Sequence, residues 1–96
     1  MRFEWDREKN ETNRKKHDID FELAKLIFDD PNHVTDDLHQ IDGEDRWITV
    51  GSIEGVITLT VVHTQRGEFP DETVRIISAR RSSRHERKRY EQAISG

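Results

Sequence analysis

The residues of this chain best suited to chemistry are the cations that crowd between Arg75 and Tyr90. Seven arginine and lysine side chains occur there against a single acid, Glu86. An arginine guanidinium keeps its positive charge and grips a phosphate through two donors. A helix N-terminus attracts anions as well. Because the cations fall where a strand is expected to give way to a helix, this stretch predicts a site for an anion such as a phosphate.

Two elements must position this cluster. Residues 73–80 are rich in β-branched apolar side chains, which predicts a strand. Ser83 and Glu86 have the spacing of a capping box, in which each side chain accepts from the backbone N–H of the other residue. A helix is therefore expected from Arg84 to about Ile94.

The same spacing assigns individual residues. If the strand extends far enough, Arg80 and Arg81 point to opposite faces, so only one of them lies in the pocket unless a bulge intervenes. Tyr90 is interpreted as a core aromatic residue rather than as a hydroxyl that faces a phosphate. On its position alone, Glu86 is a helix cap rather than a catalyst.

The composition indicates a single domain over residues 1–96 with a lean core, because 38% of the residues are charged and 31% are hydrophobic. The absence of cysteine excludes disulfides, thiolate catalysis and zinc–sulfur sites. No apolar run approaches the length of a membrane span, and residues 1–10 lack the apolar core of a signal peptide. We therefore expect a cytoplasmic protein with no membrane partner.

The formal net charge of -4 hides a strong asymmetry. Residues 17–74 contain three cations against fourteen acids, in contrast to the basic stretch that follows them. Such segregation suggests one face for an anionic partner and another for a cationic partner, or two faces that are only solvated.

The N-terminal part predicts helices. Residues 3–5 alternate apolar and polar side chains, which suggests a short strand or an aromatic anchor. Asp6 can cap a helix that runs to about Lys16, and Asp20 can cap a second helix over residues 21–29. The first helix is polar on all sides. It is held either by its asparagines and its long cationic stems, or one face is a working surface, formed by Lys9, Asn13, Lys16 and His17.

The middle of the chain predicts a loop and a sheet. Residues 32–45 are acidic and turn-rich, so we expect a mobile loop that ends at Gly43, with a possible short strand around Val34. A turn at Glu54 and Gly55 would join two of the following strands. Strands are expected at residues 46–53, 56–64 and 73–80. The order of elements indicates an α+β domain on a small antiparallel sheet, with two N-terminal helices and a C-terminal helix.

Metal and nucleophile motifs are missing from the sequence. No two histidines have the i, i+4 spacing of a helical zinc site. Asp42 and Gly43 do not complete a calcium loop, and there is no Gly-x-Ser-x-Gly motif or Gly-rich phosphate loop. We therefore expect no metal and no cofactor. The histidines considered are His17, His33, His39, His63 and His85.

The available groups suit RNA cleavage. No metal is needed when the 2′-hydroxyl of the substrate attacks the adjacent phosphate. The protein must then hold the backbone in line, move protons and neutralise the developing charge. Arginine suits the last task, and lysine or histidine suits the proton steps.

Three motifs together resemble a known family. They are Trp-Asp at residues 5–6, Asn-x-x-Lys-His at residues 13–17 and Ile-Ser-Ala-Arg at residues 77–80. The sequence FDDP lies between the second and third motifs, and the basic C-terminal stretch follows the third. With these segments included, the chain resembles the BrnT toxins of bacterial BrnT–BrnA toxin–antitoxin pairs over nearly its whole length. The usual Lys-His-Gly of the family is Lys-His-Asp here, and Asp18 can adopt a positive φ at some cost.

The resemblance implies a RelE-like fold and a metal-independent ribonuclease that cleaves RNA and inhibits translation. It implies a BrnA-type antitoxin that neutralises the toxin, and a complex that represses its own promoter, with the DNA read by the antitoxin. The ribosome is a further candidate partner. Arg80 would stabilise the transition-state phosphate, Lys16 or His17 would transfer protons or contact phosphate, and Arg66 would position substrate. The site residues implied are Lys16, His17, Arg66, Arg80 and Glu86, with Trp5 and Arg81 as weaker candidates, and the RNA-binding residues are Arg81, Arg84, Arg87 and Lys88.

Two other functions fit the residues alone. The chain could be a binding module whose basic strand–helix corner grips nucleic acid or an acidic partner without cleaving anything. It could also be a toxin of the same fold that acts on a protein. Salt-dependent RNA binding without a cleavage product would favour the binding module.

Overall fold

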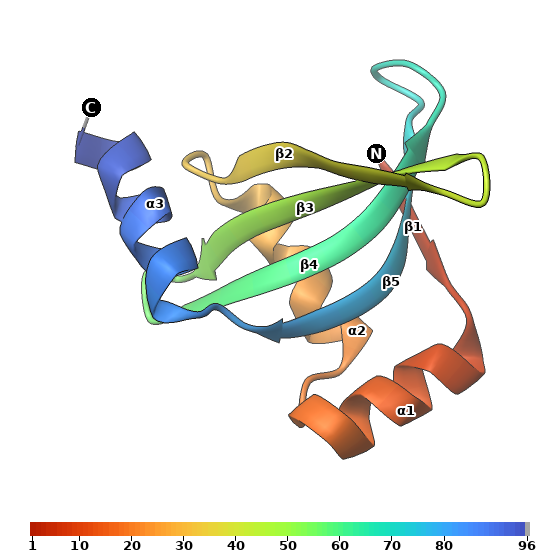
Figure 1. Ribbon diagram of the computed structural model, residues 1–96, viewed down its shortest axis with the longest axis horizontal. Helices are drawn as coiled ribbons and strands as arrows, with labels where there is room; N and C mark the ends of the chain where they lie inside the picture. Colours follow the sequence, from red (N-terminus) through yellow and green to blue (C-terminus); the bar gives the residue numbers. More distant parts are fainter. Residues whose placement is uncertain (96) are drawn as a thin grey trace.

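Five strands form one sheet in the spatial order β1-β5-β4-β3-β2 (Figure 1). This computed structural model describes the backbone of residues 1–95 and the side chains of these residues apart from 37–39 and 41. The strands are β1 (Arg2–Trp5), β2 (Val34–Ile41), β3 (Glu44–Ile53), β4 (Ile57–Arg66) and β5 (Thr73–Arg81). The helices are α1 (Arg7–His17), α2 (Phe21–Ala24), the 3-10 helix η1 (Lys25–Asp29) and α3 (Arg84–Ser95).

The sheet is mixed rather than purely antiparallel. Strands β3, β4 and β5 pair in the antiparallel order that the sequence predicts, and β2 adds a further antiparallel strand beside β3. Strand β1 pairs with β5 in parallel, with Phe3 beside Val74 and Trp5 beside Ile76. The expectation of an antiparallel sheet therefore needs correction at this edge. The N-terminal strand covers an edge of β5 that would otherwise expose unpaired backbone groups.

The acidic segment 32–45 is largely a strand and not the expected mobile loop. Strand β2 pairs with β3 along its length, with a register shift between residues 37 and 39. Asp42 and Gly43 join the two strands with φ of 52° and 76°. Positive φ at both central residues is the signature of the tight hairpin turn that favours Asp-Gly. The turn residues were visible in the sequence, but the acidic composition concealed the strand before them.

The helix ends follow the predicted caps. The Asp6 carboxylate accepts from the Lys9 N–H, and Asp18 closes α1 with φ of 58°. Asp20 caps α2, but the predicted helix over residues 21–29 is one short α-helix that tightens into η1. None of the helices within the described residues is long and apolar enough to cross a membrane.

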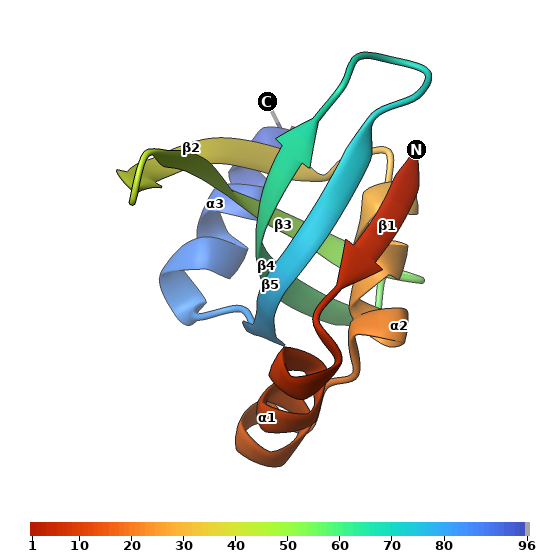
Figure 2. The ribbon, with the colours of Figure 1, turned by 90° about the vertical axis from the view of Figure 1, so that its right-hand side faces the viewer.

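Helices lie on both faces of the sheet. Helix α2 and η1 cover one face and α3 lies over the other (Figure 2). The core forms on the α2 face, where helix residues pack on β4 and β5. Its fully buried members include Phe21, Ile27, Leu59, Val61 and Val74. The face beneath α3 is covered only in part, which leaves room there for a functional site.

Candidate active site

Helix α1 is held at the edge of β5 by asparagines. Asn13 is buried and its amide hydrogen-bonds the backbone of Ala79, and the Asn10 side chain accepts from the Phe21 N–H at 2.9 Å. The asparagines therefore hold this polar helix in place, as the first of the two interpretations of its sequence expects. The last turn of α1 is left free to form one wall of a hollow, in which Lys16 and His17 meet the β5 segment.

That hollow has a volume of about 510 Å³. Lys16 and His17 line it from α1, and Ile77 and Ser78 line it from β5. Ser78 pairs with Val62 on β4, and two residues later Arg80 points to the same face of the sheet because strand side chains alternate. Arg80 does not line the hollow, but it follows on β5 two residues after Ser78, which does.

Arg80 forms a two-pronged ion pair with Glu86. The Arg80 Nη1 lies 2.6 Å from Oε1 of Glu86, and Nη2 lies 2.8 Å from Oε2. Glu86 also accepts from the Ser83 N–H at 2.7 Å and from the Thr60 hydroxyl at 3.1 Å. Two of the five guanidinium donors are used in this pair, so the others remain available for an anionic ligand. The Arg80 side chain is 39% exposed, which leaves it accessible.

Glu86 is an anchor and not a proton donor. The hydrogen bond from Arg80, helped by the Ser83 N–H and the Thr60 hydroxyl, outweighs burial and lowers the pKa of Glu86 to about 2. The same contact raises the pKa of Arg80. Because the carboxylate stays charged and the capping box forms as predicted, Glu86 fixes both the helix start and the guanidinium.

The two consecutive arginines at the end of β5 separate as the strand periodicity predicts. Arg80 pairs with Thr60 and turns toward α3, whereas Arg81 pairs with Leu59 and turns toward the other face. Arg81 is exposed. Only Arg80 therefore joins the pair with Glu86.

Two other sequence candidates lie elsewhere. Arg66 pairs with Thr73, six positions along β4 from the partner of Arg80, which is about 20 Å at 3.3 Å per residue. Its guanidinium contacts Glu4 at 2.5 Å. Trp5 packs against the core and meets Phe21 edge-on, with ring centroids 6.0 Å apart. The structure brings neither residue to the Arg80 pair.

The cations of α3 do not form one surface. Arg84 and Lys88 are exposed. Arg87 donates from Nη1 to the Ser82 carbonyl at 2.7 Å and lines a separate cleft. Arg89 contacts Asp36 on β2. The basic cluster of the sequence is therefore distributed around the helix.

Sequence reasoning missed two residues beside the ion pair. Thr60 is buried and donates to Glu86, and His85 lines a small hollow next to Glu86 and Arg89 on the sheet face. His85 stands inside the capping-box motif, so its place at the helix start was visible. Thr60 could be found only from the strand register, which a single sequence does not contain.

The histidines give no metal centre among the side chains that the structure describes, where no group of three His, Cys, Asp or Glu residues could hold an ion. His39 lies outside those side chains. His63 is fully buried, with Nε2 2.7 Å from the Thr49 hydroxyl and its ring edge-on to Phe28. Burial lowers the pKa of His63 to about 4, so it is a neutral core residue.

Comparison with known proteins gives the family. The family described as the ribonuclease toxin BrnT of type II toxin–antitoxin systems matches residues 5–86. The chain belongs to the BrnT family. A search of curated proteins finds no match.

A solved BrnT structure shows the same fold. The ribonuclease toxin BrnT of Brucella abortus, known from a 1.1 Å crystal structure, superposes with a TM-score of 0.67 at 26% sequence identity. The match covers 88% of this chain and 99% of that one. The matched region of the BrnT family, residues 5–86, contains α1 and both members of the Arg80–Glu86 pair but little of α3.

Proposed function

We propose that this BrnT chain is a metal-independent endoribonuclease that inhibits translation by cleaving RNA, and that a BrnA-type antitoxin neutralises it. The observation that supports the cleavage site most is the Arg80–Glu86 pair at the open sheet face. A guanidinium fixed in this way is preorganised, so binding an anion costs it little side-chain entropy.

In this mechanism the RNA supplies its own nucleophile. The 2′-hydroxyl attacks the adjacent phosphorus and the bond to the 5′-oxygen breaks, which leaves a 2′,3′-cyclic phosphate and a 5′-hydroxyl. Arg80 donates to the phosphate oxygens as negative charge builds on them. Glu86 acts through Arg80, by binding Nη1 and Nη2 and so fixing the guanidinium with its remaining N–H donors left for the substrate, and does not exchange protons itself.

His17 moves the protons and Lys16 contacts the phosphate in this proposal. One proton must leave the 2′-hydroxyl and one must reach the departing 5′-oxygen. Histidine is the commonest general acid or base in enzymes. His17 is half-buried and Lys16 is exposed, and both line the hollow that contains Ser78. We assign His17 to proton transfer and Lys16 to phosphate contact.

The other cations bind the flanking RNA. Arg66 is too far from Arg80 to reach the reacting phosphate, so it would contact substrate several nucleotides away. Arg81, Arg84 and Lys88 are exposed near the start of α3 and would hold phosphates there. These contacts position RNA without choosing its sequence. Promoter DNA would be bound only through the antitoxin, and the ribosome is a further candidate partner.

The test is cleavage of a labelled single-stranded RNA by antitoxin-free protein in EDTA. Wild type should cleave, and Arg80→Ala should lose about 10²- to 10³-fold in rate, as when one oxyanion donor is removed. Arg75→Ala is the matched control, because Arg75 is an exposed arginine of the same strand far from Glu86. An RNA with 2′-deoxyribose at the cleaved position should resist.

Two results would contradict the proposal. An equal loss of cleavage rate in Arg80→Ala and Arg75→Ala would mean that Arg80 is not part of the active site. Salt-dependent binding of RNA with no product, both alone and with translating ribosomes, would make the chain a binding module instead.

A further inference from the structure

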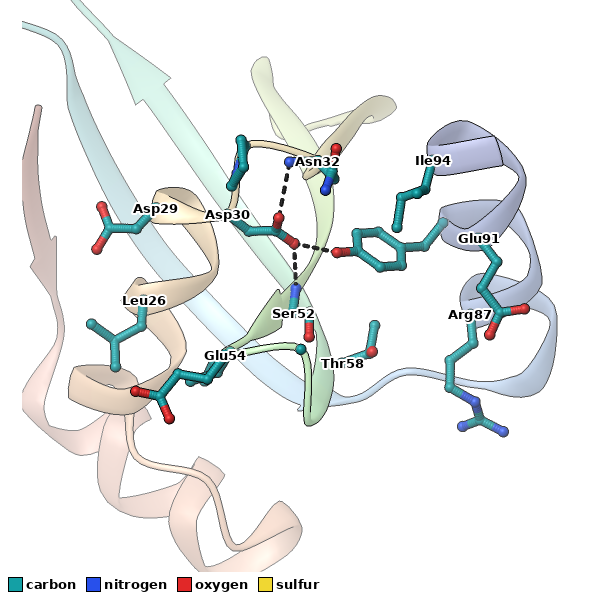
Figure 3. A pocket seen from close by; sticks show the side chains of 14 residues that line it. Leu26, Asp29, Asp30, Asn32, Ser52, Glu54, Thr58, Arg87, Glu91 and Ile94 are labelled. Atoms are coloured by element: carbon teal, nitrogen blue, oxygen red, sulfur yellow. Dashed lines mark hydrogen bonds between the residues drawn. The ribbon is translucent and has the colours of Figure 1, made fainter. Parts of the chain in front are cut away.

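A cleft of about 750 Å³ lies away from the RNA site described above. It separates α3 from the end of η1 and the β3–β4 turn (Figure 3). Neither Lys16 nor His17 nor Arg80 lines it. We call it the acidic cleft. Its charged lining residues are Asp29, Asp30, Glu54, Arg87 and Glu91, and its exposed apolar lining residues are Leu26 and Ile94.

The charge of the acidic cleft selects against nucleic acid. Four carboxylates line it against a single cation. That cation, Arg87, already donates to the Ser82 carbonyl. Asp29, Glu54 and Glu91 are exposed and stand on opposite walls (Figure 3). Phosphates would be repelled here, whereas lysine or arginine side chains would be attracted.

The walls also expose apolar surface. Leu26 on η1 is 39% exposed and Ile94 on α3 is 49% exposed, and both line the acidic cleft from opposite sides. Val56, beside the turn, is 81% exposed. Val56 does not line the cleft itself, but in a chain with a lean core two exposed aliphatic side chains on opposite walls of one cleft mark an interaction surface. The ligand must therefore offer both apolar and cationic groups.

The floor of the acidic cleft is fixed by hydrogen bonds. The Asp30 carboxylate accepts from the Tyr90 hydroxyl at 2.5 Å, from the Ser52 N–H at 2.8 Å and from the Asn32 N–H at 2.9 Å. These contacts join α3, β3 and the end of η1. The cleft is thus preformed, and a ligand does not have to order it.

We propose that the acidic cleft is the docking site for a segment of the antitoxin that presents lysine or arginine side chains beside apolar ones. This inference rests on the proposed neutralisation by an antitoxin. The occupant is argued from charge complementarity and from exposed aliphatic side chains on both walls. Because α3 begins at the capping box that holds Glu86, a partner bound here sits on the same helix as the Arg80 site without competing for its phosphate.

The test measures the Kd of the antitoxin, purified from the complex and separated, for three forms of the full chain. Glu54→Lys with Glu91→Lys reverses the two exposed rim charges. Glu68→Lys with Asp71→Lys makes the same change of net charge at exposed positions outside the cleft. We expect the first pair to raise Kd by at least about tenfold and the second pair to change it less than about twofold. Both variants should cleave RNA like wild type.

Several results would overturn the inference. One is a similar Kd for wild type and the Glu54/Glu91 variant. Another is an equal weakening of antitoxin binding by both pairs of substitutions. A free chain that sedimentation shows to be a dimer, and that the Glu54/Glu91 substitutions make monomeric, would assign the cleft to a second copy. RNA cleavage is measured separately, so a chain that binds antitoxin through the cleft but cleaves nothing would refute only the proposed ribonuclease activity.

Discussion

The side-chain amide of Asn13 makes two hydrogen bonds to the backbone of Ala79, 66 positions later in the chain. Its Nδ2 donates to the Ala79 carbonyl at 2.9 Å, and its Oδ1 accepts from the Ala79 N–H at 3.1 Å. Strand β1 pairs with this edge of β5 only as far as Ile76. The Asn13 amide therefore continues the backbone pairing beyond the end of β1 and holds α1 beside the candidate active site.

Replacing Asn13 with alanine should cost about 2–4 kcal/mol of unfolding free energy, because the buried backbone groups of Ala79 lose their partners. Urea unfolding of Asn13→Ala and wild type would measure this. Thr12→Ala is the control, since Thr12 is the exposed neighbour on the same helix and should change stability by less than about 0.5 kcal/mol. A loss below about 1 kcal/mol for Asn13→Ala would contradict this role.

Local signals predicted the parts of the fold that depend on neighbouring residues. Asp6, Asp20 and the Ser83–Glu86 capping box act within three positions of themselves, and each forms as expected. The parallel pairing of β1 with β5 and the Asn13 contact depend on segments far apart in the sequence. A side-chain pattern does not specify which distant edge a strand or an amide will meet.

The same distinction between local and long-range contacts applies to the candidate site. The Arg80–Glu86 pair spans six residues and follows from a strand end beside a helix cap. Family resemblance groups Arg66 with this pair, yet the antiparallel register of β4 and β5 places Arg66 at the opposite end of these two strands. The acidic cleft could not be anticipated, because its walls come from three separate segments.

Gly51 should tolerate no side chain. A Cβ there would lie 2.9 Å from the Ile27 carbonyl oxygen and 3.0 Å from the Ile27 Cβ, so β3 and η1 would have to move apart. We expect Gly51→Ala to lose about 2–3 kcal/mol in urea unfolding. Gly55→Ala is the comparison, since nothing lies within 4 Å and only its φ of 70° opposes alanine, at about 1 kcal/mol. The reverse order of the two losses would refute the close approach of η1.

Glu86→Gln should lower stability at pH 7 by about 1–2 kcal/mol, because the partly buried Arg80 loses its charged partner. The pKa of Glu86 is about 2 in the folded chain against an ordinary value of 4.5, so its carboxylate stabilises the fold above pH 4.5. That contribution disappears as the pH falls toward 2. Unfolding curves at several pH values should converge for wild type and Glu86→Gln in this range. Glu91→Gln, on an exposed residue of the same helix, should follow wild type throughout.

His63 should make the stability of the fold depend on pH in a different pH range from Glu86. Burial, aided by the nearby charge of His33, lowers the pKa of His63 from 6.5 to about 4 although the Thr64 carbonyl opposes the shift. The unfolded chain therefore binds a proton first as the pH falls. Stability is fully present above pH 6.5 and declines by up to about 3 kcal/mol on the way to pH 4, where the decline ends for this residue.

The measurement for His63 is urea unfolding at pH 7.0, 5.5 and 4.5 for wild type and His63→Gln. Glutamine can keep a hydrogen bond to Thr49 but does not titrate, so the variant should be less stable at pH 7 and should show a smaller loss on acidification. Parallel losses in the two proteins would mean that His63 is protonated equally in the folded and unfolded chains. Since Glu86 responds only below pH 4.5, the two residues separate the acid response into two independent steps, one in the core and one at the proposed active site.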